Sequence, residues 1–202
     1  MEWINTMLEL LPFSFLQYDF MKNAFLAVLL LAPLFALLGT MTVNNNMAFF
    51  SDALGHSALT GIGIGTLLGL KEPLFCMIAF GIFLSLAITK VKDGTTSSDT
   101  IISVFSSTAM AVGIVILSQE GGFAKFSSYL IGDVLTVTQK DLFLIFVVLL
   151  LSYFIWALLY NSLLLVSVNP SLAVSRNVNA RFTENVFVVL VAITVMVSIR
   201  LM

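Results

Sequence analysis

The chain has 202 residues, of which 59% are hydrophobic and only 10% are charged, and its mean hydropathy is +1.07. A folded domain in water carries about a quarter of its residues as charged side chains, so nine basic and eleven acidic residues cannot cover a soluble globule of this size. The net charge of −2 comes with lysines and arginines scattered singly, which excludes the basic face that nucleic-acid binding needs. The composition indicates a protein surrounded by lipid.

Residues 1–23 precede the apolar segments and are too often interrupted to cross a membrane. Glu9, Pro12 and Asp19 break up a run of leucines and phenylalanines, a pattern that favours an interfacial helix lying along the bilayer. The segment lacks the positively charged start and the small-residue cleavage site of a signal peptide. We therefore expect it to be retained.

Six later stretches approach the length of about 20 mostly apolar residues that a helix needs to cross a bilayer. They are residues 24–43, 53–70, 73–89, 100–118, 142–168 and 186–202, and nearly all charged residues fall between them. No internal repeat divides the chain. The sequence thus predicts an all-α polytopic transmembrane helical bundle, a single domain over residues 1–202 with about six spanning helices in residues 24–202.

One ionisable pair lies against an apolar span without a compensating charge nearby: Asp52 and His56. Their spacing of four residues places both side chains on one helix face. A carboxylate and an imidazole in this arrangement can share a divalent cation, and ionisable groups within a membrane mark ion or substrate pathways. Two structural alternatives stay open at this stage. Ser51 and Asp52 could cap the helix that follows, and His56 could form a hydrogen bond between helices.

Two further patterns concern the packing of helices. Gly61, Gly65 and Gly69 recur at every fourth position, which indicates close approach of a neighbouring helix in lipid. Hydroxyl residues cluster around the start of the fourth stretch, and we favour bonds to the preceding helical turn over a hydrated pathway. Cys76, the single cysteine, lies in an apolar run and is interpreted as core filler.

The polar stretch 169–184, with Pro170 placed to start a helix, suits a docking helix for a soluble partner or a plain solvated loop. The basic residues of the loops do not resolve the orientation in the membrane. No phosphate-binding glycine loop is present in the sequence, so we expect this chain not to hydrolyse a nucleotide itself. We expect no catalytic residue and no bound cofactor.

Three motifs resemble the metal-type ABC transporter permeases, which import zinc, manganese or iron. The first is residues 51–61 (SDALGHSALTG), which is long and ungapped. The second joins residues 98–102 (SDTII) to 109–115 (AMAVGIV), and the third is residues 129–135 (YLIGDVL). The resemblance extends over residues 20–202.

The resemblance implies a permease subunit in a bacterial plasma membrane, paired with a second copy of itself, with cytoplasmic ATPases that bind the ATP, and with an extracytoplasmic metal-binding protein. It implies that Asp52 and His56 contact the transported metal. It also likens residues 171–179 to the segment that contacts the ATPase, which would place the loops at 44–52, 90–99 and 170–183 in the cytoplasm.

Relative to the family pattern, the chain ends about two spans early, and we interpret it as C-terminally truncated. Two alternatives to an ABC permease therefore remain. The same Asp52 and His56 suit a secondary carrier driven by an ion gradient, and a truncated gene suits a remnant without transport activity.

Overall fold

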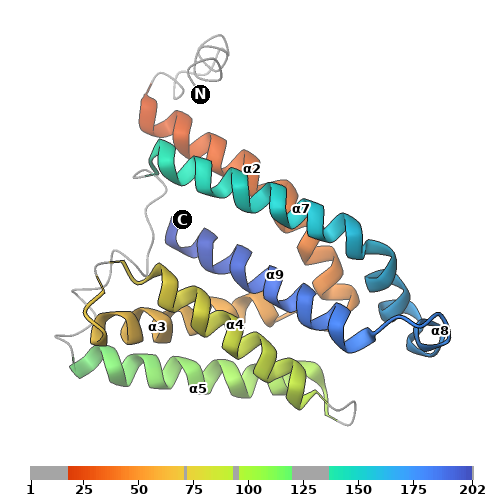
Figure 1. The fold of residues 1–202 in the computed structure, drawn as a ribbon. Coiled ribbons are helices and arrows are strands. Elements are labelled where there is room, and N and C mark those ends of the chain that lie inside the picture. The colour runs from red at the N-terminus through yellow and green to blue at the C-terminus, as the bar shows by residue number, and fades with distance from the viewer. Residues whose placement is uncertain (1–17, 71, 93–95, 120–136, 202) are drawn as a thin grey trace.

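The computed structural model describes residues 18–70, 72–92, 96–119 and 137–201, and every regular element in these ranges is a helix (Figure 1). In chain order the helices are α2 (Asp19–Asn44), α3 (Phe50–Leu67), α4 (Leu74–Val91), α5 (Ser98–Gln119), α7 (Gln139–Val168), α8 (Pro170–Ser175) and α9 (Ala180–Leu201). The predicted all-α polytopic bundle is confirmed. The motif at 129–135 lies outside the described residues.

Five of the described helices are long and apolar enough to cross a membrane, namely α2, α4, α5, α7 and α9. The sixth expected span, residues 53–70, corresponds to α3, which falls short because Asp52, His56 and four glycines dilute its apolar character. Ten of the 18 residues of α3 are nevertheless buried. Neighbouring helices therefore cover much of α3, although the side chains of Asp52 and His56 themselves are 70% and 44% exposed.

The predicted interfacial segment, residues 1–23, meets the structure only at its end. Residues 1–17 lie outside the described residues, and α2 already begins at Asp19. The boundary at residue 23 is therefore wrong, since residues 19–23 belong to a helix that is long and apolar enough to cross a membrane.

Polar caps explain why two other helices begin earlier than their apolar stretches. The Thr138 hydroxyl accepts a hydrogen bond from the Asp141 backbone N–H at 3.4 Å, and the Asp141 carboxylate accepts one from the Thr138 N–H at 3.0 Å. This reciprocal arrangement satisfies backbone donors that a helix start leaves unpaired. The Asn179 side chain accepts a backbone N–H at the start of α9 in the same way.

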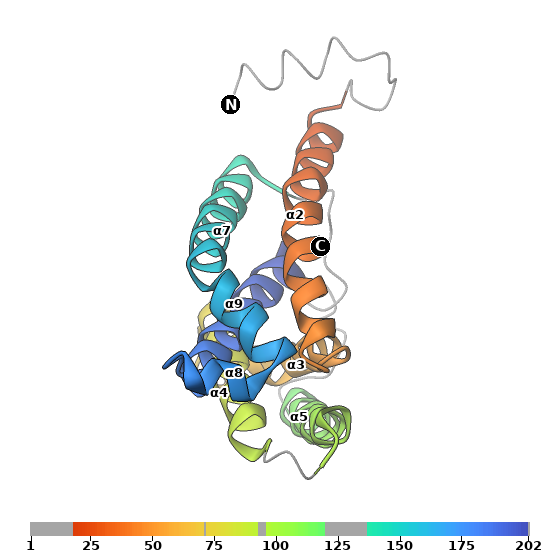
Figure 2. The same cartoon turned by 90° about the vertical axis from the view of Figure 1, so that its right-hand side faces the viewer.

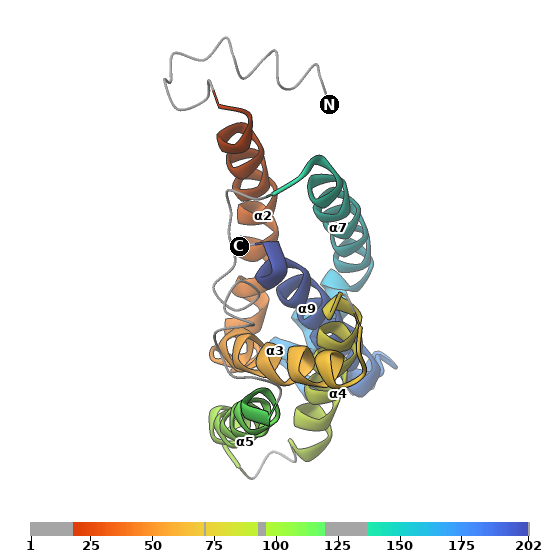
Figure 3. The same ribbon diagram turned by 90° about the vertical axis from the view of Figure 1, so that its left-hand side faces the viewer.

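The helices form two groups with α9 between them. In one group α3 packs between α4 and α5, and in the other α2 packs against α7 (Figures 1 and 2). Helix α9 contacts α3, α4 and α7, and Figure 3 shows it in the middle of the bundle. In its most apolar window 61% of α9 is buried, against 17% of α7. Helix α7 therefore presents most of its surface outward, which suits lipid or another subunit.

Helices α3 and α5 run parallel and touch at their backbones. The Thr60 hydroxyl donates a hydrogen bond to the Ala109 carbonyl, and a Cβ at Gly113 would lie 2.8 Å from the Thr60 nitrogen. Further along, a Cβ at Gly63 would lie 2.9 Å from the Ile116 side chain. Since later residues of α3 meet later residues of α5, these contacts fix both the direction and the register of the two helices.

Helices α3 and α4 approach just as closely on another side of α3. A Cβ at Gly61 would lie 2.6 Å from Met77 Cα, and one at Gly65 would lie 2.9 Å from Pro73 Cβ. The predicted role of Gly61 and Gly65 in close helix packing is confirmed. Gly69 follows the end of α3 with φ of +67°, so it serves the turn toward α4 instead.

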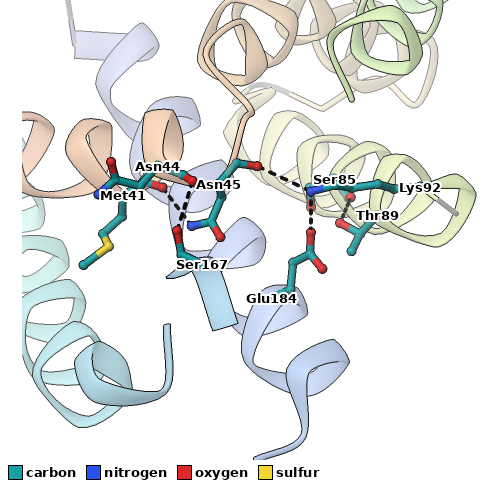
Figure 4. Close-up of polar contacts among 8 residues, drawn as sticks. All are labelled: Met41, Asn44, Asn45, Ser85, Thr89, Lys92, Ser167 and Glu184. Atoms are coloured by element: carbon teal, nitrogen blue, oxygen red, sulfur yellow. Dashed lines mark hydrogen bonds and ion pairs between the residues drawn. The ribbon is translucent and has the colours of Figure 1, made fainter. Parts of the chain in front are cut away.

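Polar contacts join four helix ends on one side of the bundle (Figure 4). The Lys92 ammonium, just after α4, contacts the Glu184 carboxylate of α9 at 3.0 Å and donates to the Asn45 carbonyl at 3.5 Å. Near the end of α7, the Ser167 hydroxyl donates to the Asn44 carbonyl at 3.0 Å. These contacts hold the ends of α2, α4 and α7 beside the start of α9.

A hydrogen bond also joins the starts of α2 and α7. The Asn23 side chain of α2 donates to the carbonyl of Val137, just ahead of α7, at 3.1 Å. Helices α2 and α7 are thus fastened to each other at both ends. The segments 44–52 and 170–183 and residues 90–92 flank the Lys92 cluster, so they lie on one side of the bundle. This agrees with the expectation that they face the same compartment.

Replacing Gly61 by alanine should destabilise the bundle, because the added methyl group would overlap the α4 backbone at Met77. Overpacking of this kind costs roughly 1–3 kcal/mol. The midpoint of thermal unfolding in detergent measures the effect. Gly39→Ala in α2 is the matched control, since a Cβ there meets nothing within 4 Å. Equal midpoints for the two variants would contradict the close approach of α3 and α4.

Removing one partner of the Lys92–Glu184 ion pair should lower stability, since each side chain is only 24% exposed. We expect roughly 1 kcal/mol of coupling in a double-mutant cycle with Lys92→Ala and Glu184→Gln. Lys90→Ala is the control, because Lys90 is exposed on the same end of α4. Additive losses in the double variant would show that the two side chains do not interact.

Candidate functional site

Asp52 lies inside the first turn of α3. The helix begins at Phe50, and its N-cap residue is Phe49, which makes no side-chain capping bond. The interpretation of Ser51 and Asp52 as capping residues is therefore wrong. The oxygens of Asp52 are thus not used in a helix cap.

The structure brings Asp52 and His56 together as their spacing predicts. His56 Nε2 lies 3.5 Å from Asp52 Oδ2, and the two side chains are 44% and 70% exposed, respectively. A separation of 3.5 Å is too long for a strong hydrogen bond. Among the described residues Asp52, on the same helix, is the polar partner of His56, so this histidine does not tie two helices together. Both groups remain accessible to a ligand.

The pair opens into a pocket of about 260 Å³ between α3 and α5. Its walls come from one face of each helix, with residues spaced three, one and three apart along α3 and its N-cap, and one, three, one and three apart along α5. The lining residues are Phe49, Asp52, Ala53 and His56 of α3 and Ile102, Ser103, Ser106, Ser107 and Met110 of α5. The polar lining residues are Asp52 and His56 on the α3 side and Ser103, Ser106 and Ser107 on the α5 side. The backbone contact at Thr60 and Gly113 closes the space between the helices beyond the pocket.

The hydroxyl residues of α5 fit both of the roles considered for them. Ser103 and Ser107 donate to the carbonyls of Asp99 and Ser103, as expected for a helix in lipid. They also line the pocket beside His56. The helical spacing of each lining face is visible in the sequence, but which faces oppose each other depends on the register of α3 and α5, which no local pattern specifies.

The described residues contain no group of three or more His, Cys, Asp or Glu side chains that could hold a metal ion. Asp52 and His56 alone do not make a closed site, since a structural zinc site usually takes four ligands. Cys76 is half-buried in α4 and lies apart from the pocket. Any metal coordination in this pocket therefore needs further ligands beyond Asp52 and His56.

Helix α8 forms at the segment for which a docking helix or a solvated loop was expected. Pro170 occupies its first turn, and the Asn169 side chain caps it by accepting the Leu172 N–H at 3.1 Å. Ala173 is buried, whereas Leu172 and Val174 are exposed. A short helix is therefore present, it is anchored by one residue, and it displays apolar side chains on its surface.

Comparisons with known proteins agree on one family. The model of the ABC 3 transport family matches residues 17–202. A membrane protein of Synechocystis is 34% identical over 92% of this chain and 66% of its own length. A high-affinity zinc uptake system membrane protein of Haemophilus influenzae is 28% identical over 91% of this chain and 71% of its own length. A manganese import system permease protein of Streptococcus parasanguinis is 27% identical over 91% of this chain and 66% of its own length.

A solved structure, PsaBC from Streptococcus pneumoniae in complex with Fab, matches with a TM-score of 0.74 at 23% identity, over 91% of this chain and 66% of that one. At 23% identity, this match supports the fold and nothing more specific. The chain spans about two thirds of the length of several of these relatives. The family model and the sequence relatives together cover nearly all described residues, so the chain is a multi-pass membrane protein that belongs to the ABC 3 transport family.

Proposed function

We propose that this chain is the membrane-spanning permease subunit of an ABC importer for divalent metal ions. The observation that carries the proposal is the pocket between α3 and α5, in which a carboxylate and an imidazole 3.5 Å apart are both exposed. Zinc, manganese and iron are the candidate ions, and two of the relatives are named for zinc and for manganese. The chain itself works as a conduit, not as an enzyme.

The chemistry of the pair suits a metal that passes through. Neutral imidazole nitrogen binds zinc and iron, and carboxylate oxygen suits manganese. Because both ligands come from adjacent turns of one helix, an ion binds them without drawing separate helices together. Alternating access then consists of moving the spans so that the pocket faces first one side of the membrane and then the other.

Energy and delivery come from partners. The sequence has no phosphate-binding loop, so cytoplasmic ATPase subunits bind and hydrolyse ATP, and an extracytoplasmic metal-binding protein supplies the ion. The exposed Leu172 and Val174 of α8 are the contact for the ATPase, which orients the Lys92 cluster toward the cytoplasm. A second copy of the permease completes the channel in the plasma membrane.

The single histidine of the chain makes a direct binding test available. Diethyl pyrocarbonate should modify His56 readily in purified protein carrying a histidine-free tag, since its side chain is 44% exposed. Zinc or manganese should slow this reaction several-fold, because the metal occupies the same imidazole nitrogen. Asp52→Asn should weaken the protection, whereas Thr66→Ala, on α3 outside the pocket, should leave it unchanged. Modification at equal rates with and without metal would contradict the site.

Transport is tested by the metal content of the native cells in metal-poor medium. Deleting this chain should lower cellular zinc, manganese or iron, and the wild-type chain should restore it. We expect His56→Ala to restore less than about a tenth of the uptake, as loss of a metal ligand typically costs tenfold or more in affinity or activity. Thr66→Ala is the control.

The energy source separates this proposal from an ion-gradient carrier. Uptake should stop on ATP depletion and should persist when only the proton gradient is collapsed. The opposite pattern would identify a secondary carrier. Unchanged metal content after deletion, in cells without a second importer for the same ion, would leave the chain without the proposed activity.

A further inference from the structure

The polar wall opposite Asp52 and His56 consists of three serine hydroxyls on one face of α5. Ser103, Ser106 and Ser107 all line the pocket, and their spacing of three and one places them along a single stripe of the helix. The family assignment does not explain why three hydroxyls occupy the face that an ion would have to pass.

The hydrogen bonds of these hydroxyls leave their oxygen lone pairs available. Ser103 and Ser107 each donate their proton to a carbonyl of the preceding turn, both at 2.8 Å. A hydroxyl has one proton and two acceptor lone pairs, so the oxygens can still face a cation. The Ser106 hydroxyl makes no hydrogen bond to any residue in the part of the chain that the structure describes, so it is free to turn toward the pocket.

A purely structural role does not account for this clustering. Thr108 and Ser118 donate to carbonyls of the preceding turn at 2.8 and 2.7 Å, yet neither lines the pocket. Bonding to the preceding turn is thus available on any face of α5. The pocket face differs in having three hydroxyls within two turns, opposite an accessible carboxylate and imidazole.

Asp99 extends the same stripe by one turn, since it precedes Ser103 by four residues. Its Oδ1 atom is buried and has no hydrogen-bond partner among the described residues. A buried carboxylate oxygen without a donor is costly unless a cation or water approaches it. Asp99 is not one of the residues that line the pocket, so this oxygen belongs to the start of α5 and not to the pocket wall.

We propose that Ser103, Ser106 and Ser107 form an oxygen wall that takes the place of hydration water around the ion and makes the pocket favour Mn²⁺ over Zn²⁺. This proposal rests on the proposed function. Oxygen ligands suit hard cations such as manganese, which bind a large number of them, whereas zinc is satisfied by four ligands and binds imidazole well. Removing the hydroxyls therefore reduces the binding of Mn²⁺ more than that of Zn²⁺.

The test compares the two ions in the same variants. Ser106→Ala and the triple variant Ser103→Ala, Ser106→Ala, Ser107→Ala are set against Ser106→Thr, which keeps the hydroxyl, and against Thr108→Val and Ser118→Ala, which lie off the pocket. The first readout is protection of His56 from diethyl pyrocarbonate by Mn²⁺ and by Zn²⁺ in purified monodisperse protein. The second is the ratio of manganese to zinc taken up by cells that carry each variant.

We expect the triple variant to require about tenfold more Mn²⁺ for the same protection, with a change of at most twofold for Zn²⁺, and we expect Ser106→Ala to show part of this effect. Ser106→Thr and both controls should match the wild type. Equal losses for the two ions, or no loss in a well-folded triple variant, would overturn the oxygen wall while leaving the role of His56 intact. Failure of both ions to protect His56 in the wild-type chain would overturn both proposals.

Discussion

The structure depends on how closely α3 approaches its two neighbours. Helix α3 carries Asp52 and His56 and is too polar to be one of the five candidate spans, so within a bilayer it has to be enclosed by other helices. Glycines make this enclosure possible, because Gly61 and Gly63 allow α4 and α5 to touch it where any side chain would collide. In lipid, helices gain little from apolar contact as such, and close packing of small residues is the main source of association.

The same contacts determine the geometry of the candidate site. The bond from Thr60 to the Ala109 carbonyl and the contact at Gly113 fix the register of α3 against α5. One helical turn before this contact, the same face of α3 again faces α5. There His56 and Ser107 line the same pocket. Packing near the middle of the two helices thus decides which polar groups share a pocket nearer their starts.

The sequence predicted the spans well because lipid imposes a length and an apolarity on each helix that are visible residue by residue. It missed helix starts that depend on polar caps, such as Thr138 and Asn179, since these residues lie outside the apolar stretches. Helix α3 is the least apolar of the six expected spans, because Asp52, His56 and four glycines lower its hydropathy. The pairing of Asp52 with His56 follows from helical spacing alone, whereas the serine wall depends on a contact between segments about fifty residues apart.

A pocket with few firm ligands suits passage better than storage. A closed site with four protein ligands holds zinc tightly enough to stabilise a fold, and an ion held so firmly would leave slowly. Conduction instead requires binding that is strong enough to replace hydration and weak enough to release the ion. In the proposed pathway, Asp52 and His56 on one helix face, with neutral hydroxyls opposite, meet both conditions. Selectivity between ions in this pathway then depends on the oxygen atoms around the ion.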